Sequence, residues 1–433
     1  MSDKKKIELF RKKKQNVLTE IYDKDQDEFN TVNKNSKVIK ANTTYRRTKM
    51  NNFGLKISKL YSPMPMYKVL IITTIVAIFF GVISVFFVKN VGIYNFGLAA
   101  FGQAAARLVV VKLPASVAAD VRNLIDQIIF WLAYIILSIP IFIFGYYKIG
   151  RIFTILTVLF LIVSSFTSIG IGLIPGANEV YLIGDFSNKA VQEALPEYQK
   201  KLSNLIPLFW NEGGNIIALM IYSMSYGFML AWVFAIIAIL GGTAGVTGVI
   251  GEWYANTKQK SFGTISGYMN IVIVLISVLV GSWLPGSLLL SEAEKLNGAN
   301  NQALRILADK AWGFEMYLSP NFVATILSNV VYIAVLNKLY PKFKLVRVEI
   351  FSMYCDDVKD KILLDRKIVT GITLFKGEGG YSKKQIDVIT SITLFRQIPR
   401  IIKDVRKIDP EAFIAVSEVN AIDGYVYLPE KKF

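Results

Sequence analysis

Long apolar stretches separated by short polar segments run through the middle of the chain, from residue 67 to residue 340. A helix that crosses the hydrocarbon core of a bilayer needs ~20 largely apolar residues. The pattern therefore predicts an α-helical polytopic membrane protein with about six transmembrane helices. The windows that meet the length requirement are Tyr67–Val88, Ile125–Tyr147, Arg151–Ile174, Ile216–Leu240, Ser261–Leu284 and Pro320–Leu339.

Two further apolar segments, 92–111 and 241–255, are short and rich in small residues. We expect both to be broken or re-entrant, because irregular backbone at membrane depth is tolerated only where protein buries it or a wet cavity adjoins it. Helices that start after Phe101 and after Gly241 would present free N–H groups and a positive dipole end to an anionic or carbonyl-bearing ligand. Alternatively, the small residues only let neighbouring helices pack closely.

Lysine and arginine in short loops indicate which side of the membrane each loop faces. The N-terminal arm, the turn 148–151, Lys258 and Lys260, and the segment from Lys338 onward are expected on the cytoplasmic side. These constraints are met if the first short segment enters and leaves on the outer side and the second does so on the inner side. The two halves would then be inverted repeats, as in many secondary transporters.

Residues 341–433 are charged and alternating, and they predict strands and helices in the order β-α-β-β-α-β. This order is the ferredoxin-like pattern. The predicted organisation is thus an arm over 1–66, a membrane domain over 67–340 with repeats at 67–175 and 207–340, and a C-terminal cytoplasmic α+β domain over 341–433. We expect a multi-pass cell-membrane protein with both termini cytoplasmic.

The arm is polar and is expected to be mostly disordered. Residues 1–66 carry 16 Lys/Arg against 7 Asp/Glu. Their net charge of 16 − 7 = +9 is more than half of the chain's formal net charge of +17. Each basic residue near a membrane surface contributes ~1 kcal/mol of attraction to anionic lipid headgroups. The arm is therefore expected to bind such lipids, to act as a topology signal, or both; no nucleic-acid partner is expected.

Composition limits the chemistry. Hydrophobic residues make up 53% of the chain, histidine is absent, and Cys355 is the single cysteine. Serine and cysteine hydrolase triads, His-ligated zinc and cysteine-rich metal sites therefore lose their usual residues. We expect no enzyme activity, no metal and no cofactor.

The run VTGITLFKGEGGYSKKQIDVITSITLFRQIPRIIKDVRKIDPEAF resembles the small domain that ends bacterial YitT-family membrane proteins. The blocks GGTAGVTGVIGEW and FGTISGYMNIVIVLIS resemble that family's second Gly-rich segment and the helix after it. The resemblance implies a transporter-like layout and a soluble domain similar to PII-type regulatory folds. Two positions depart from the family pattern: Phe101-Gly102 replaces a Gly-Gly pair, and Gly248 stands where an acidic residue is common.

The candidate sites follow from the short segments and from the soluble domain. Asn270, which lies within an apolar helix, could contact a ligand or join helices by hydrogen bonding. The candidate substrate-binding residues are Gly102, Gln103, Arg107, Gly241, Gly242, Thr243, Gly245, Thr247 and Asn270. The candidate effector-binding residues are Gly377, Glu378, Gly379, Gly380 and Tyr381, whose glycines could equally form only a hairpin turn.

These features predict a transporter or permease of a small solute, regulated or assembled by a cytoplasmic ligand-sensing domain. The helix-end argument favours a small anion or zwitterion as substrate. The alternative is a membrane-anchored receptor or scaffold whose soluble domain binds a small effector without transport. Homo-oligomer formation is compatible with both.

Overall fold

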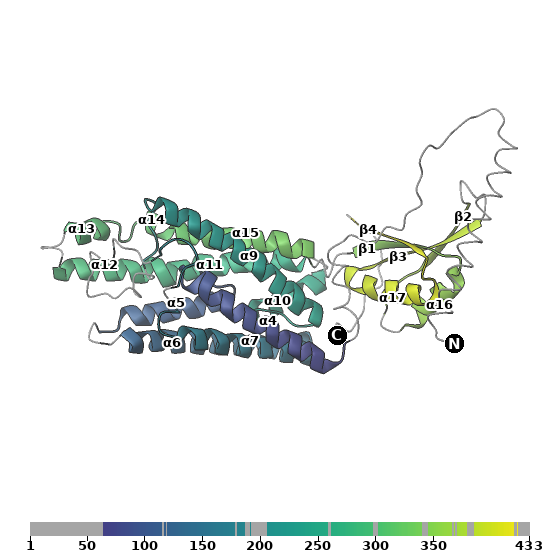
Figure 1. The fold of residues 1–433 in the computed structure, drawn as a ribbon, viewed down its shortest axis with the longest axis horizontal. Helices are drawn as coiled ribbons and strands as arrows, with labels where there is room; N and C mark the ends of the chain where they lie inside the picture. The colour runs from purple at the N-terminus through teal and green to yellow at the C-terminus, as the bar shows by residue number, and fades with distance from the viewer. Residues whose placement is uncertain are drawn as a thin grey trace, which may run out of the picture.

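The computed structural model of the protein describes residues 64–114, 117, 119–177, 180–186, 191, 206–258, 261–297, 302–339, 345–365, 368, 370–378, 385–419 and 422. The arm expected over 1–66 lies almost wholly outside these residues. Within them, the chain forms an elongated helical bundle, with a small domain of strands and two helices at one end (Figure 1).

Six helical segments are long and apolar enough to cross a membrane, which confirms the predicted helical class. They are Met66–Lys89, Leu124–Lys148, Arg151–Gly172, Gly213–Leu240, Phe262–Glu292 and Phe314–Leu339. The helices of the bundle are α4 (Met66–Ser84), η1 (Val85–Lys89, a π-helical turn), α5 (Leu98–Val111), α6 (Ala119–Lys148), α7 (Arg151–Gly172), α9 (Gly213–Leu240), α10 (Val246–Lys258), α11 (Phe262–Val278), η4 (Leu279–Trp283, also π-helical), α12 (Leu284–Asn297), α13 (Gln302–Ala308), α14 (Phe314–Tyr317) and α15 (Pro320–Leu339).

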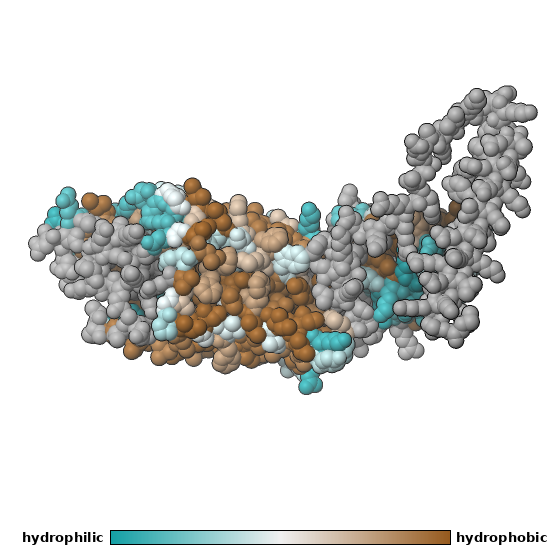
Figure 2. Space-filling model, in the orientation of Figure 1, coloured by the Kyte–Doolittle hydropathy of each residue, from teal (hydrophilic) through white to brown (hydrophobic). Residues whose placement is uncertain are grey.

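The outward positions of α4 carry large apolar side chains, and several of its inward positions carry small or polar ones. On α4, Ile71, Ile75 and Ile78 are 54%, 60% and 44% exposed, whereas Thr73 and Ala77 are fully buried. Figure 2 shows the apolar surface on one face of the bundle. Lipid tails are as apolar as isoleucine, so membrane helices pack through small residues and interhelical hydrogen bonds.

The C-terminal domain has the predicted order β1 (Leu345–Phe351), α16 (Cys355–Leu364), β2 (Thr373–Glu378), β3 (Gln385–Leu394), α17 (Ile398–Ile408) and β4 (Phe413–Glu418), with a 3-10 turn η5 (Phe395–Gln397) before α17. Its antiparallel sheet has the strand order β2-β3-β1-β4. The domain has its own hydrophobic core, to which the sheet contributes Val346, Val348 and Ile350 and the helices contribute Val358 and Ile401. The helices α16 and α17 lie together on one face of the sheet (Figure 1).

One predicted detail of the bundle is wrong. The first short helix begins at Leu98 after Gly97, not after Phe101, and the second begins at Val246, five residues beyond Gly241. The φ angle of Gly97 is 63°, in the left-handed region that glycine adopts without penalty, so the chain breaks there. The run Leu98–Phe101 that follows it has no helix-breaking residue and joins the helix.

Candidate functional site

The N-termini of the two short helices, α5 and α10, meet inside the bundle. A Cβ atom on Gly97, which precedes α5, would overlap the hydroxyl of Thr247 in the first turn of α10. Ala99 and Val246 belong to one buried apolar cluster, against which Leu98 packs. Two segments that lie about 150 residues apart in the sequence are thereby joined end to end. We call this contact the α5–α10 junction, defined by residues 97–99 and 246–247.

The linker before α10 carries several of the candidate residues. Gly241 ends α9 in the left-handed conformation, with φ 97°. The backbone N–H of Gly242 donates to the carbonyl of Ile237, and that of Thr243 donates to Oγ1 of Thr157 on α7, at 3.3 Å. These bonds fix the path of residues 241–245, because buried backbone groups need partners.

Thr243 leaves no room for a side chain at position 248. Its hydroxyl occupies the space that a Cβ on Gly248 would need. A larger residue at position 248 therefore requires a smaller or displaced residue at 243.

Asn270 places the junction at depth in the bundle. Thr247 Oγ1 donates to Asn270 Oδ1 at 3.5 Å, and Asn270 is completely buried. Asn270 lies eight residues after Phe262, the first residue of α11. At 1.5 Å per residue this is about 12 Å along the helix, against a hydrocarbon core about 30 Å thick. Phe262 also begins the apolar span Phe262–Glu292, so Asn270 and the junction lie inside that span and not at its end.

Hydrogen-bonding groups at the junction are left unused. Among the described residues, neither Oγ1 of Thr243 nor Nδ2 of Asn270 has a hydrogen-bond partner, although both side chains are buried. An unsatisfied buried polar group costs about 1–3 kcal/mol. Groups of this kind need an explanation, and a bound solute or water is one that also fits the free N–H groups at helix N-termini.

An aromatic cluster joins the two backbone breaks. Phe96, next to Gly97, has its ring centroid 5.0 Å from that of Tyr332 and 5.8 Å from that of Tyr226. The ring centroid of Phe234 lies 5.1 Å from that of Tyr332, and a Cβ on Gly245 would lie 3.1 Å from Phe234 Cζ. The hydroxyl of Tyr332 donates to Ser266 Oγ at 3.2 Å, so this ring is held in place and its polar atom has a partner.

Two candidate residues on α5 have structural roles. Gln103 accepts a hydrogen bond from the backbone N–H of Asn95 and donates one to the carbonyl of Ile93, so it holds the loop before the junction. A Cβ on Gly102 would lie 2.7 Å from the carbonyl oxygen of Phe130, so Gly102 permits close packing of α5 on α6. For Gly102, close packing was the alternative interpretation of the sequence.

Arg107 belongs to a separate polar cluster further along α5. Its side chain is 8% exposed, and Nη1 donates to Tyr94 Oη at 3.0 Å and to Ser282 Oγ at 2.9 Å. Within the described residues no carboxylate forms an ion pair with Arg107.

The candidate effector turn is described only at its start. Gly377 and Glu378 end β2, and Glu378 pairs with Gln385 of β3, so residues 379–384 connect the strands of an antiparallel hairpin. Gly379, Gly380 and Tyr381 lie outside the described residues.

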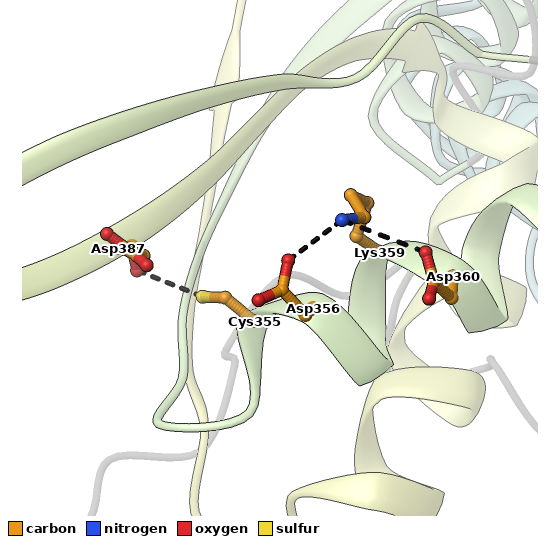
Figure 3. Close-up of polar contacts among 5 residues, drawn as sticks. All are labelled: Cys355, Asp356, Lys359, Asp360 and Asp387. Atoms are coloured by element: carbon orange, nitrogen blue, oxygen red, sulfur yellow. Dashed lines mark hydrogen bonds and ion pairs between the residues drawn. The ribbon is translucent and has the colours of Figure 1, made fainter.

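A group of polar contacts in the same domain involves Cys355, the first residue of α16 (Figure 3). Its Sγ donates to the backbone carbonyls of Asp387 and Ser352 at 3.0 and 3.1 Å. Burial raises the pKa of the Cys355 thiol, whereas the Lys359 ammonium, 2.8 Å from Asp356, lowers the pKa of that carboxyl. The described residues include no group of three carboxylates, thiols or imidazoles placed to hold a metal ion.

Sequence reasoning missed Gly97, Phe96, Tyr332 and Thr157. A signal was present only for Gly97, which interrupts an apolar segment shortly after Gly92. The others are ordinary residues of apolar helices, and only the packing of distant segments brings them to the junction.

The comparisons with known proteins agree with this architecture. Residues 370–424 match a family model described as an uncharacterized protein conserved in bacteria, DUF2179. The chain is 31% identical over 413 residues to the Mycoplasma pneumoniae homolog of uncharacterized protein MG443, covering 94% of this chain and 96% of that protein. It is 30% identical over 404 residues to uncharacterized protein MG443 of Mycoplasma genitalium, covering 92% and 98%.

A shorter match extends to a named membrane protein. Over 75 residues the chain is 35% identical to the UPF0750 membrane protein YpjC of Bacillus subtilis, covering 17% of this chain and 25% of that protein. No solved structure matches the chain.

Proposed function

Because the chain belongs to the YitT-like UPF0750 family of multi-pass membrane proteins with a C-terminal DUF2179 domain, we propose that it is a permease for a small solute. The solute site is the α5–α10 junction. In this proposal the helical bundle carries out transport without covalent chemistry, so the protein is not an enzyme.

The observation that carries the proposal is the meeting of two short-helix N-termini at depth in a bundle of six long apolar helices. Discontinuous helices whose ends point at a common site near the bilayer midplane are a hallmark of secondary transporters. Thr243 and Asn270 add unused hydrogen-bonding groups to the same place. Burying unpaired hydrogen-bonding groups in an apolar layer costs free energy, and binding a transported solute would satisfy these groups.

The solute class follows from the helix ends. Each N-terminus presents free N–H groups and about half a positive charge from its dipole. Two such ends favour an anionic or carbonyl-bearing group on the solute. The aromatic cluster of Phe96, Tyr226, Phe234 and Tyr332 would pack against the apolar part of the solute.

The two halves of the bundle would move as inverted repeats that expose the junction alternately to either side. The basic arm and the DUF2179 domain would lie in the cytoplasm, where the positive-inside rule places their charges. In that arrangement the soluble domain can bias the bundle toward one state when an effector binds, because a ligand with unequal affinity for two states shifts their populations.

The experiment that tests the proposal is solute uptake by proteoliposomes. A panel of metabolites is first screened by thermal stabilisation of the full-length protein in detergent, and stabilising compounds are then assayed for uptake. Thr247→Val removes the hydroxyl at the junction without changing side-chain shape, and uptake should fall by about tenfold.

The matched control is Thr167→Val on α7. The hydroxyl of Thr167 donates to the carbonyl of Val163 within its own helix. This variant should transport as the wild type does. An equal loss of uptake in both variants would contradict the proposal. So would a wild-type protein that takes up no solute of the panel.

A further inference from the structure

Three elements converge on the guanidinium of Arg107. The loop before α5 contributes Tyr94, whose ring centroid lies 4.9 Å from the guanidinium carbon. The π-helical turn η4 contributes Ser282, and the Tyr94 and Ser282 hydroxyls lie 2.7 Å apart. Arg107 itself extends from α5. A cation over an aromatic ring and beside two hydroxyls is held in one position.

The π-helical turn brings Ser282 into this cluster. A Cβ on Gly281 would lie 2.7 Å from both Ala104 Cα and Tyr94 Oη, so η4 packs directly on α5 and the loop. Insertions of this kind in an α-helix occur frequently at functional sites. The turn thus departs from regular helix where it meets the buried cation.

The guanidinium retains unused donors. Its two hydrogen bonds to the cluster both come from Nη1, and no described residue accepts a hydrogen bond from Nε or Nη2. No described carboxylate neutralises its charge, and only 8% of the residue is exposed. A planar guanidinium with a free edge matches a carboxylate or phosphate group, which it binds through two parallel hydrogen bonds.

We propose that Arg107, with Tyr94 and Ser282, is a binding site for the anionic group of a small solute, separate from the α5–α10 junction. Ser282 lies twelve residues beyond Asn270 along the same helical segment, or about 18 Å at 1.5 Å per residue. The site is displaced from the junction away from the β-sheet domain. The opposite end of α11, at Thr264, contacts Asn337 near the end of α15, and α15 is the helix that precedes that domain in the chain.

In a permease, an anion would bind at this site first and then move on to the junction. That role rests on the proposed function, whereas binding itself is measurable without transport. A positive charge near the entrance raises the local concentration of anions and excludes cations. The chemical class is a small organic acid or inorganic phosphate.

The test is the thermal midpoint of the full-length protein in nanodiscs of neutral phosphatidylcholine, titrated with sodium lactate or sodium phosphate at constant ionic strength. The proposal predicts a saturable rise with at least one of these anions and none with choline chloride. In Arg107→Gln the apparent affinity should fall by about tenfold or more, and in Arg107→Lys by less, because the ammonium keeps the charge but loses the bidentate edge.

Three further arms keep the test decisive. If Arg107→Gln does not fold, Tyr94→Phe and Ser282→Ala each remove one supporting hydroxyl and should weaken binding by about threefold. Arg122→Gln is the matched control, since Arg122 donates to the carbonyl of Pro114 outside this cluster, and it should bind as the wild type does. Nanodiscs with phosphatidylglycerol test whether a lipid headgroup occupies the site instead.

The proposal is overturned if neither anion stabilises the wild type, if the Arg107, Tyr94 and Ser282 variants respond as the wild type does, or if only phosphatidylglycerol stabilises it. Failure of the permease itself is a different result. In that case anions bind in an Arg107-dependent manner, yet proteoliposomes take up no solute.

Discussion

The Thr247 hydroxyl fills the position that a Cβ on Gly97 would take, so Gly97 and Thr247 are in direct contact where the two short helices begin. This contact joins a backbone break in the first half of the chain to a helix N-terminus in the second. The site that we propose depends on it, because the helix ends can converge only if residue 97 lacks a side chain.

Gly97→Ala should lower the thermal midpoint of the detergent-solubilised protein by several degrees. A non-glycine residue in the left-handed region costs about 1–2 kcal/mol, and here the added methyl group also displaces Thr247. Gly176→Ala is the control, because Gly176 has φ 80° but open space around its Cβ position. Equal destabilisation by both variants would show that the contact with Thr247 contributes nothing.

Asn270→Leu should leave the thermal midpoint unchanged or raise it. The Nδ2 of Asn270 has no partner among the described residues, so removing it relieves an unsatisfied group. The bond that Oδ1 accepts from Thr247 is lost as well, but at 3.5 Å it is long and therefore weak. Asn321→Leu provides the contrast, because Asn321 donates to the carbonyls of Val91 and Gly92 and accepts from the N–H of Leu208.

The Asn321 variant should lose about 3 kcal/mol or more of stability, since it leaves several buried backbone groups unpaired. A large loss of stability in Asn270→Leu would mean that this amide is structural, and the junction would lose its proposed ligand group.

Gly248→Asp should destabilise the protein alone and recover in combination with Thr243→Ala. The Thr243 hydroxyl fills the space beside Gly248, so an added side chain has room only when Thr243 is shortened. The measurement is the yield of monodisperse protein together with its thermal midpoint. If the double variant is no more stable than Gly248→Asp, the two positions are not sterically coupled.

Cys355 should react slowly with iodoacetamide at pH 7–8, where exposed cysteines react readily. Burial raises the pKa of the thiol above its ordinary value, so little thiolate is present. Because Cys355 is the single cysteine, the rate reports this site alone. A rate equal to that of a free cysteine would contradict the buried position.

The same shift predicts a pH dependence of stability. A group whose pKa is raised on folding contributes stability that is complete below its unfolded-state pKa, about 8.5 for cysteine. That stability is lost as the pH rises toward the higher pKa of the folded state. Wild-type stability should therefore decline above about pH 8.5 more steeply than that of Cys355→Ala. Parallel curves for the two proteins would exclude the effect.

The sequence was sufficient to predict the membrane helices and the order of strands and helices along the C-terminal domain, because both signals are local. A largely apolar stretch of ~20 residues, such as Tyr67–Val88, specifies a span by hydropathy alone. Alternation in Leu345–Phe351 specifies a strand with one buried face. These predictions needed no knowledge of partners elsewhere in the chain.

The junction could not be placed to the residue because its determinants are non-local. Gly97 packs against Thr247, and the backbone N–H of Thr243 donates to Thr157, so the residues that define the junction come from distant parts of the chain. The predicted start after Phe101 followed from small-residue composition, which does not distinguish a helix interior from its end. Gly102 is small because α6 packs against it.

The central claim is that the helical bundle itself moves solute, and the most direct test is uptake by proteoliposomes containing the chain truncated after residue 340. The account predicts that the truncated protein, once shown to be folded by its thermal transition, retains measurable uptake of the solute carried by the full-length protein, with altered regulation. Complete loss of uptake by a folded truncated bundle, or absence of uptake even by the full-length protein, would contradict it.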